Sequence, residues 1–361
     1  MPDSSYRLTA PSGRVADEGE AAVEVTGGAV VVSPPSGRPL RLALADVAEV
    51  GEPRADTLRL GLEGGAALEL RRLGPLHGRL LAQVAAARAG ARCAALGLDG
   101  AGRPEVFAGA VDGQAAELRL YDDALVTVPR AGEPDKVPYP FVGRLLPDIW
   151  GDRLTVEVAG REPLAVERLV RRTAELVELL HRHRRRCAVQ AADLLAGLLP
   201  GLGPLELRAA AGRLGDGAAA PRSALDAVDA TIWPALLAAV ATDERRGAVA
   251  ALERLGEPWL GLKRLPGGER PAMLAFLLCP VDGRLVYEAL NRPDPTVVYR
   301  ADGPDELRAR NRALDLAGFR PDGADGPRLP LLAALDAARL GRVEHGAGWA
   351  ARLGALAGAP A

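Results

Sequence analysis

The sequence predicts an α+β protein in which two small antiparallel sheet or barrel units, each closed by a C-terminal helix, precede a module of helices and a β-meander. Short runs in which apolar and polar residues alternate indicate half-buried strands. Each series of such runs leads into apolar residues at helical spacing. The stretch from Ala21 to Arg88 also aligns with the stretch from Ala115 to Arg184 with little gapping, which indicates an internal duplication.

The first repeat contains a series of strand patterns followed by one helix. Val23 and Val25 begin the series, and Leu76, Leu80 and Val84 follow it at helical spacing. The strand positions between them are Val30 to Val32, Leu40, Leu42, Leu44, Leu58, Leu60, Leu62, Leu68 and Leu70. Gly27-Gly28 links the first two runs, and a two-residue glycine link between alternating runs predicts a hairpin turn.

The second repeat has the same order of patterns. Its predicted strand positions are Leu118, Leu120, Val126, Val128, Leu154, Val156 and Val158. Asp122-Asp123 takes the place of the two glycines, and such a carboxylate pair is typical of a solvated turn. A helix is expected from Leu169 to Cys187, with Leu169, Thr173, Leu176, Val177 and Leu180 on its inward side.

The third region begins with a mostly helical stretch from Ala188 to Gly256. Four short strands are then expected at Trp259–Leu265, Ala272–Cys279, Arg284–Leu290 and Thr296–Arg300. Turns rich in proline and glycine separate these strands. Asp302 to Glu306 predicts a helix start and Gly318 its end, and a helical tail is expected from Leu329 to Leu356.

These patterns divide the chain into four parts. Residues 1–20 form an N-terminal segment without a strand or helix signal, of a kind that is often disordered. The first unit comprises residues 21–92 and the second unit residues 104–187, and the C-terminal module comprises residues 188–361. Whether this module is a third, divergent copy of the unit stays open, because it does not align with the other two.

A small antiparallel sheet closed by one amphipathic helix resembles the pleckstrin-homology-like fold. The resemblance rests on the order and size of the elements and covers about half of the chain. It implies binding of phosphoinositides, peptides or proteins. The lipid-binding members place basic residues around the first hairpin. Here the corresponding hairpins are the uncharged Thr26–Ala29 and the acidic Tyr121–Ala124, and two carboxylates repel phosphate.

Composition excludes several classes of protein. The 361 residues are 48% hydrophobic and 25% charged, which suits a protein with real cores, and the net charge of -2 argues against nucleic-acid binding. All basic residues except Lys136 and Lys263 are arginine, as GC-rich coding in a bacterium produces. The three separated cysteines favour a reducing cytoplasm, and we expect no signal peptide and no integral membrane segment.

The sequence lacks the motifs of common active sites. It contains no phosphate-binding loop, no nucleophile elbow and no paired zinc-ligand motif, so we expect no catalytic residues, no metal and no cofactor. Cys279 is expected to be a small core residue, and Trp150, Trp233, Trp259 and Trp349 are expected to pack in a core or an interface. The alternative is an enzyme of unknown class with a pocket in the C-terminal module. Arg264, Glu269, Tyr287 and Asp302 are its candidate residues.

The most charged stretch is HRHRRRC at 181–187, which the pattern places at the end of the second unit's helix. His181 and His183 point about 200° apart on a helix, so they cannot bind the same metal ion. Arg182 follows Glu178 at the favourable i,i+4 spacing. Arg171, Arg182, Arg185 and Arg186 fall on the outer side of the helix, whereas His183 and Cys187 continue the inward side. We predict that these four arginines bind an anionic partner or an acidic surface of the neighbouring domain.

Duplication without catalytic motifs favours a non-enzymatic protein-binding or scaffold protein with tandem pleckstrin-homology-like units. Besides the enzyme, the alternative is peripheral binding to anionic membrane lipid. We expect a protein partner, and the sequence does not determine the oligomeric state.

Overall fold

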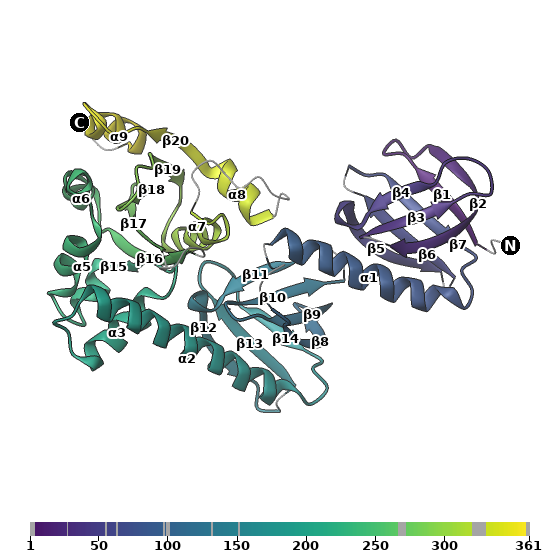
Figure 1. Cartoon of the computed structure of the whole chain (residues 1–361), viewed down its shortest axis with the longest axis horizontal. Helices are drawn as coiled ribbons and strands as arrows, with labels where there is room; N and C mark the ends of the chain where they lie inside the picture. Colours follow the sequence, from purple (N-terminus) through teal and green to yellow (C-terminus); the bar gives the residue numbers. More distant parts are fainter. Residues whose placement is uncertain are drawn as a thin grey trace. The chain divides into compact units, whose positions relative to one another are not determined.

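The computed structural model describes residues 4–26, 28–54, 56–62, 64–96, 98, 102–130, 133–150, 152–265, 272–319 and 330–358. The predicted α+β class is confirmed. Two seven-stranded antiparallel sheets, each followed by one long helix, precede a helical region and a third sheet. Among the described residues the two end strands of each sheet do not pair, so the sheets are open (Figure 1).

The first sheet has the strand order β4-β3-β2-β1-β7-β6-β5. Its strands are β1 (Ser4–Thr9), β2 (Val15–Thr26), β3 (Ala29–Ser33), β4 (Leu40–Ala43), β5 (Val47–Arg54), β6 (Thr57–Leu62) and β7 (Ala67–Arg71). Gly28, with φ +72°, lies in the β2–β3 turn that the sequence predicts. The helix α1 (Leu76–Ala95) follows the sheet, and Leu80 and Val84 lie in the same apolar core as the strands.

The N-terminal segment corrects one prediction. Residues 1–20 were expected to lie outside the first unit, yet β1 and the first half of β2 occupy them. The strand β1 pairs with both β2 and β7, so it lies in the middle of the sheet. Residues Val15 to Glu20 are all exposed, so this part of β2 needs no apolar residues and leaves no alternation in the sequence.

The second sheet repeats the first, element by element. Its order is β11-β10-β9-β8-β14-β13-β12. The strands are β8 (Glu105–Val111), β9 (Gln114–Leu120), β10 (Ala124–Pro129), β11 (Asp135–Pro138), β12 (Val142–Pro147), β13 (Arg153–Val158) and β14 (Leu164–Glu167). A short 3₁₀ helix follows the fourth strand in each sheet, η1 (Leu44–Asp46) and η2 (Tyr139–Phe141). Arg72 and Arg168 both take a left-handed conformation directly after the last strand.

The helix after the second sheet differs from the prediction at both ends. The helix α2 comprises Thr173–Leu198, whereas the sequence pattern predicts a helix at residues 169–187. It starts late because Arg168, Val170 and Arg171 take left-handed conformations. It continues past Cys187 because Ala188 to Gly197 contains good helix formers, and the first proline comes at Pro200. The HRHRRRC stretch therefore lies in the middle of α2, and its arginines do not balance a helix end.

The third region consists of a sheet with helices on both faces (Figure 1). Its helices are α3 (Pro204–Leu214), α4 (Arg222–Asp226), α5 (Ile232–Val240), α6 (Asp243–Leu255), α7 (Pro304–Leu316), α8 (Pro330–Ala338) and α9 (Trp349–Ala357). Its strands are β15 (Ala220–Pro221), β16 (Trp259–Leu265), β17 (Ala272–Val281), β18 (Arg284–Ala289), β19 (Thr296–Arg300) and β20 (Arg339–Val343), paired in sequence order.

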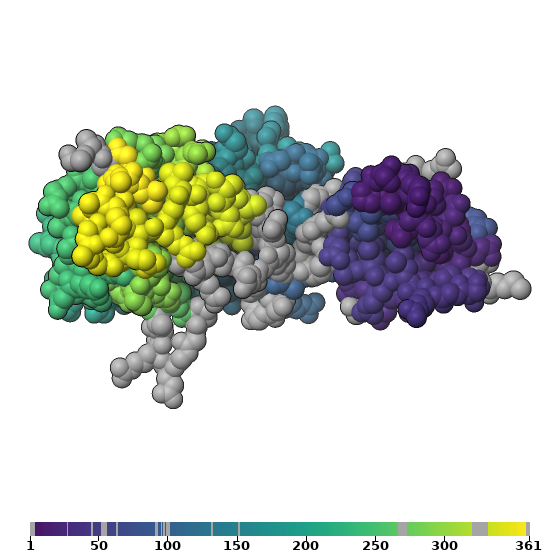
Figure 2. Space-filling model, turned by 90° about the horizontal axis from the view of Figure 1, so that it is seen from above, coloured from purple at the N-terminus to yellow at the C-terminus, as the bar shows by residue number. Residues whose placement is uncertain are grey.

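Alternate residues of this sheet enter two different cores. On β17, Ala275, Leu277 and Cys279 share a core with the end of α2 and with α3, α5, α6 and α9. Leu274 and Phe276 face α7 and α8 on the opposite side. The four predicted strands are confirmed, as is Cys279 as a core residue. The expected helical tail is corrected, because β20 interrupts it between α8 and α9; Figure 2 shows these C-terminal residues in yellow on the surface of the region.

The chain packs into two compact units whose boundary passes through the second sheet. The first consists of Met1–Asp122, Val126–Lys136 and Val166–Leu169, and the second of Asp123–Leu125, Val137–Ala165 and Val170–Ala361. This division differs from the predicted boundary between residues 187 and 188, because α2 runs across that position without a break. No helix among the described residues is long and apolar enough to cross a membrane.

Candidate functional site

The predicted arginines lie on an exposed side of α2. Arg182, Arg185, Arg186 and Val189 are spaced i, i+3, i+4 and i+7, so they share one face of the helix, which we call the arginine face. All four side chains are exposed, and Val189 keeps 60% of its surface accessible. The face combines three guanidinium groups with an apolar contact, a composition that protein interfaces favour.

Local contacts hold these arginines without covering them. Arg182 forms the expected ion pair with Glu178, with an N–O distance of 2.9 Å. Arg185 Nε donates to the carbonyl of His181 at 3.3 Å. Arg186 Nη2 lies 3.1 Å from His183 Nδ1. Since an exposed ion pair is worth little, the guanidinium groups can exchange these contacts for those of an anionic partner at small cost.

The opposite side of α2 faces inward at His183 and Cys187, as the sequence predicts. The ring of His183 stacks on Tyr139 of η2, with centroids 4.9 Å apart and an interplanar angle of 9°. Burial raises the pKa of the Cys187 thiol, which keeps it protonated and unreactive at neutral pH. Neither residue belongs to a metal-binding cluster within the described residues.

Arg171 is separated from the other three arginines. It lies in the turn before α2 with φ +65°, next to Val170, and both side chains are exposed. The helical spacing of the sequence predicts a place on the helix for it. That placement is wrong because α2 begins at Thr173.

A second exposed surface lies at the turn between β12 and β13. Ile149 and Trp150 are 89% and 80% exposed, so Trp150 does not pack in a core, and of the two expectations for it only packing in an interface stays a prediction. Asp148 fixes this turn: its Oδ1 accepts hydrogen bonds from the backbone N of Asp152 at 2.9 Å and of Arg153 at 3.3 Å. The turn residues Pro147-Asp148 and Gly151-Asp152 around an Ile-Trp pair are the signal from which this surface could have been predicted.

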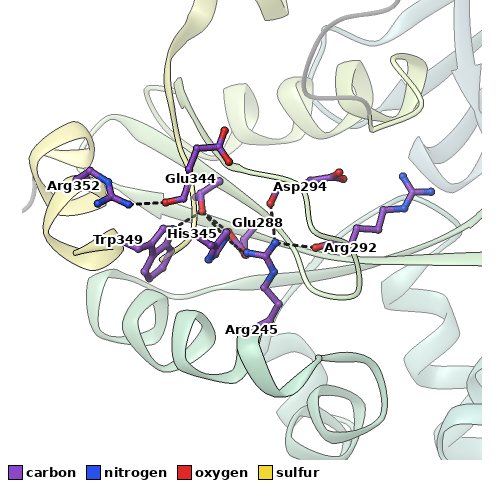
Figure 3. A network of polar contacts seen from close by, with 9 residues as sticks. Arg245, Glu288, Arg292, Asp294, Glu344, His345, Trp349 and Arg352 are labelled. Carbon is purple, nitrogen blue, oxygen red and sulfur yellow. Dashed lines mark hydrogen bonds and ion pairs between the residues drawn. The ribbon is translucent and has the colours of Figure 1, made fainter. Parts of the chain in front are cut away.

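A buried polar network lies in the third region (Figure 3). Glu288 of β18 is fully buried, and its Oε1 lies 3.0 Å from both Arg245 Nη1 of α6 and His345 Nε2. The hydroxyl of Thr296 on β19 donates to Glu288 Oε2 at 2.5 Å, and Trp349 Nε1 of α9 donates to that hydroxyl at 2.8 Å. Arg245 also donates to the carbonyls of Arg292 and Asp294, each at 2.9 Å.

The electrostatics of this network follow from burial. Burial raises the pKa of Glu288 to about 7, although the hydrogen bond from Thr296 and the charge of Arg245 oppose the shift. Burial and the Arg245 charge lower the pKa of His345 to about 4, so the imidazole is neutral at neutral pH. Its ring stacks on Trp349, with centroids 5.1 Å apart.

We assign the network a structural role. A carboxyl group with a pKa near 7 suits general acid–base catalysis, but a catalytic group must reach a substrate. Glu288 is enclosed by protein groups, and no serine, cysteine or lysine is among its partners in the contacts described above. The network joins α6, β18, β19 and α9, and so it attaches the C-terminal segment to the sheet.

A cavity of about 640 Å³ lies in the second compact unit. It is lined by residues 140–143, residues 157–163 and the start of α7. Its charged groups are largely paired, since Glu157 binds Arg144 at 2.8 Å and Asp305 binds Arg308 at 3.0 Å. Arg144 lowers the pKa of Glu157, so this carboxylate stays ionised and is a poor proton donor.

The three candidate residues of the enzyme alternative that the structure describes have separate surroundings. Arg264, Tyr287 and Asp302 are not among the described residues that line this cavity. Tyr287 is fully buried in the core beside Phe276 and Phe319. Arg264 bonds to Gln190 of α2 at 2.8 Å, and Glu269 lies outside the described residues.

No protein-family model matches the chain, and no curated protein matches its sequence.

Proposed function

We propose that this chain is a non-enzymatic protein-binding or scaffold protein that docks an acidic protein partner on the arginine face of α2. The observation that carries the proposal is the spacing and exposure of Arg182, Arg185 and Arg186 beside Val189. Arginine makes paired hydrogen bonds to carboxylates, and an exposed valine adds apolar contact at the same place. Arg171 adds positive charge just before the start of the same helix.

The two repeated units supply the framework for this surface. Each has seven antiparallel strands in the same order followed by one helix. This order supports the proposal that both are pleckstrin-homology-like domains, a class that includes protein and peptide binders. We propose a bacterial, cytoplasmic setting in which the chain meets its partner without binding nucleic acid.

The test is affinity capture with the full chain from the native host, followed by quantitative mass spectrometry. The variant Arg182→Glu/Arg185→Glu/Arg186→Glu reverses the charge of the arginine face. The matched control is Arg246→Glu, which reverses a similarly exposed arginine in the first turn of α6. We expect at least one acidic protein to be lost from the triple variant and retained by the control. Identical protein sets from the three baits would refute the proposal.

A vesicle sedimentation experiment with the same variants tests for peripheral membrane binding. Vesicles with and without phosphatidylserine are sedimented with the wild-type chain and the triple variant. We expect no sedimentation of either protein, since Asp148 and Asp152 beside the apolar Ile149-Trp150 turn oppose an anionic bilayer. Sedimentation that requires phosphatidylserine and disappears in the triple variant would replace the protein partner with a lipid surface.

A further inference from the structure

The β12–β13 turn has the chemistry of a ligand for the arginine face. We call residues 148–150 and 152 the acidic–apolar tip, because Asp148 and Asp152 flank Ile149 and Trp150. Two large apolar side chains that are exposed side by side are uncommon on a monomer and mark interaction surfaces. Trp150 is also of the residue type that most often dominates binding energy.

Hydrogen bonds of Asp148 connect the described residues on the two sides of the tip. Asp148 accepts hydrogen bonds from two backbone N–H groups of the turn, and its own N–H donates to the carbonyl of Arg153 at 2.9 Å. Leu146, on the adjacent strand β12, is also exposed and extends the apolar surface. Residues that such hydrogen bonds hold before docking lose less conformational entropy when they bind, so their contacts contribute more fully to affinity.

The tip and the arginine face are complementary group by group. Carboxylates of the tip match the guanidinium groups of Arg182 and Arg185. The indole of Trp150 offers a face on which a guanidinium can stack. Ile149 matches Val189, the exposed apolar residue one turn further along α2. An acidic surface that carries an aromatic residue is what a helix face of arginines and a valine would select.

We propose that the arginine face of one copy of this chain binds the acidic–apolar tip of a second copy. This inference rests on the proposed function of the arginine face and names its partner. Because each copy carries both surfaces, two reciprocal contacts related by a twofold axis close a dimer. The carboxylates of the tip attract the arginine face of a second copy but repel an anionic membrane, so charge complementarity favours the second copy as the partner.

Sedimentation velocity of the full chain over a range of concentrations tests the dimer. We expect the wild type to dimerise and Trp150→Ser to weaken the dimer by about 30-fold, because the twofold dimer loses this contact at both of its reciprocal sites. Ile149→Ser should act in the same direction. The matched control is Leu205→Ser, because Leu205 is 74% exposed on α3 but lies outside both surfaces. Melting temperatures confirm that each variant is folded.

Charge exchange tests which surfaces meet. Asp152→Arg and Arg185→Asp should each weaken the dimer, and the chain that carries both changes should recover at least tenfold. Asp148 is left intact because it holds the turn. A wild-type chain that stays monomeric at the highest concentration, or a combined variant no better than either single one, overturns the proposal.

The result also separates this inference from the proposed function. If the chain is monomeric and the triple arginine variant still loses an acidic protein in the capture experiment, the arginine face serves another partner. If the chain dimerises and charge exchange restores the dimer, while capture shows no other protein lost, the second copy is the only partner that these experiments support.

Discussion

The two repeated units share one topology, and two of the differences between them lie at the candidate binding surfaces of the second unit. The turn after its fifth strand contains Ile149 and Trp150, whereas β5 and β6 of the first unit are separated only by residues 55 and 56. The closing helix α2 has 26 residues and α1 has 20, and the extra length continues into the core of the third region. The duplication therefore supplies a scaffold, and the departures from it supply the candidate binding surfaces.

Replacing equivalent glycines by alanine should produce the largest difference in stability between the two units. Gly160, between β13 and β14, has φ +74°, and a Cβ there would overlap the backbone of Ala309 in α7. Gly64, between β6 and β7, has φ +90° with open space around it. Gly160→Ala combines backbone strain with overpacking and should lower the free energy of unfolding by about 4 kcal/mol.

The matched change Gly64→Ala introduces only the strain and should cost about 1 kcal/mol. Thermal and urea unfolding of both variants measure the difference. Equal losses would show that the turn of the second unit has no closer packing than that of the first, contrary to the overlap at Ala309.

Replacing one arginine in each closing helix should affect the stability of the chain to different extents. Arg88 of α1 is buried, and it donates to the carbonyls of Val47 and Ala48, each at 2.9 Å. Arg88→Leu leaves these carbonyls without a donor and should cost about 3 kcal/mol. Arg185→Leu on α2 removes an exposed side chain and should change stability by less than about 0.5 kcal/mol.

Urea unfolding measures both losses, and partner capture is the second readout for Arg185→Leu. We expect α1 to depend on its arginine for stability and α2 to need its arginine only for binding. A larger stability loss for Arg185→Leu than for Arg88→Leu would contradict the assignment of the arginine face as a binding surface.

Sequence patterns predicted the parts of the fold that local chemistry determines. The strands β16 and β19 begin and end where the sequence places them, because buried apolar residues are bounded by proline and glycine turns. The strand β20 was missed because Arg339 to Val343 contains two arginines and a glycine, and its pairing with β19 compensates for the weak pattern. Propensity is overruled there by a tertiary contact.

The candidate sites also contain some features that local sequence patterns predict and others that only tertiary contacts produce. The outward direction of Arg182, Arg185 and Arg186 follows from helical spacing, so the sequence was sufficient to predict it. The exposure of Trp150 has a local signal in the turn residues on either side of it, but that signal does not say which partner would cover the side chain. The partners Arg245, Glu288 and His345 come from elements far apart in sequence, and only the folded sheet brings them together.

The third region should differ from both repeats in how its stability depends on pH. Glu288 has a pKa of about 7 in the folded chain and about 4.5 when unfolded, so its contribution is complete below pH 4.5 and is lost as the pH rises to 7. His345 behaves in the opposite way, because its pKa falls from 6.5 to about 4 on folding. Its contribution is complete above pH 6.5 and is lost as the pH falls to 4. Between pH 4.5 and 6.5, the stability that Glu288 loses as the pH rises is therefore largely offset by the stability that His345 gains.

Replacing either Glu288 or His345 should reveal how the remaining residue makes stability depend on pH. Relative to wild type, His345→Gln should lose about 2 kcal/mol of stability as the pH rises from 4.5 to 7, somewhat less than the full shift of Glu288 implies, because the change also opens the site to water. Glu288→Gln should lose stability in the other direction, as the pH falls from 6.5 to 4. Urea unfolding at several pH values gives both slopes, and slopes of the same sign would show that the two groups do not hold opposite protonation states in the folded chain. Opposite slopes would show that the C-terminal segment is attached by a carboxyl group and an imidazole that exchange one proton on unfolding, whereas the apolar contacts of the two repeat helices do not titrate.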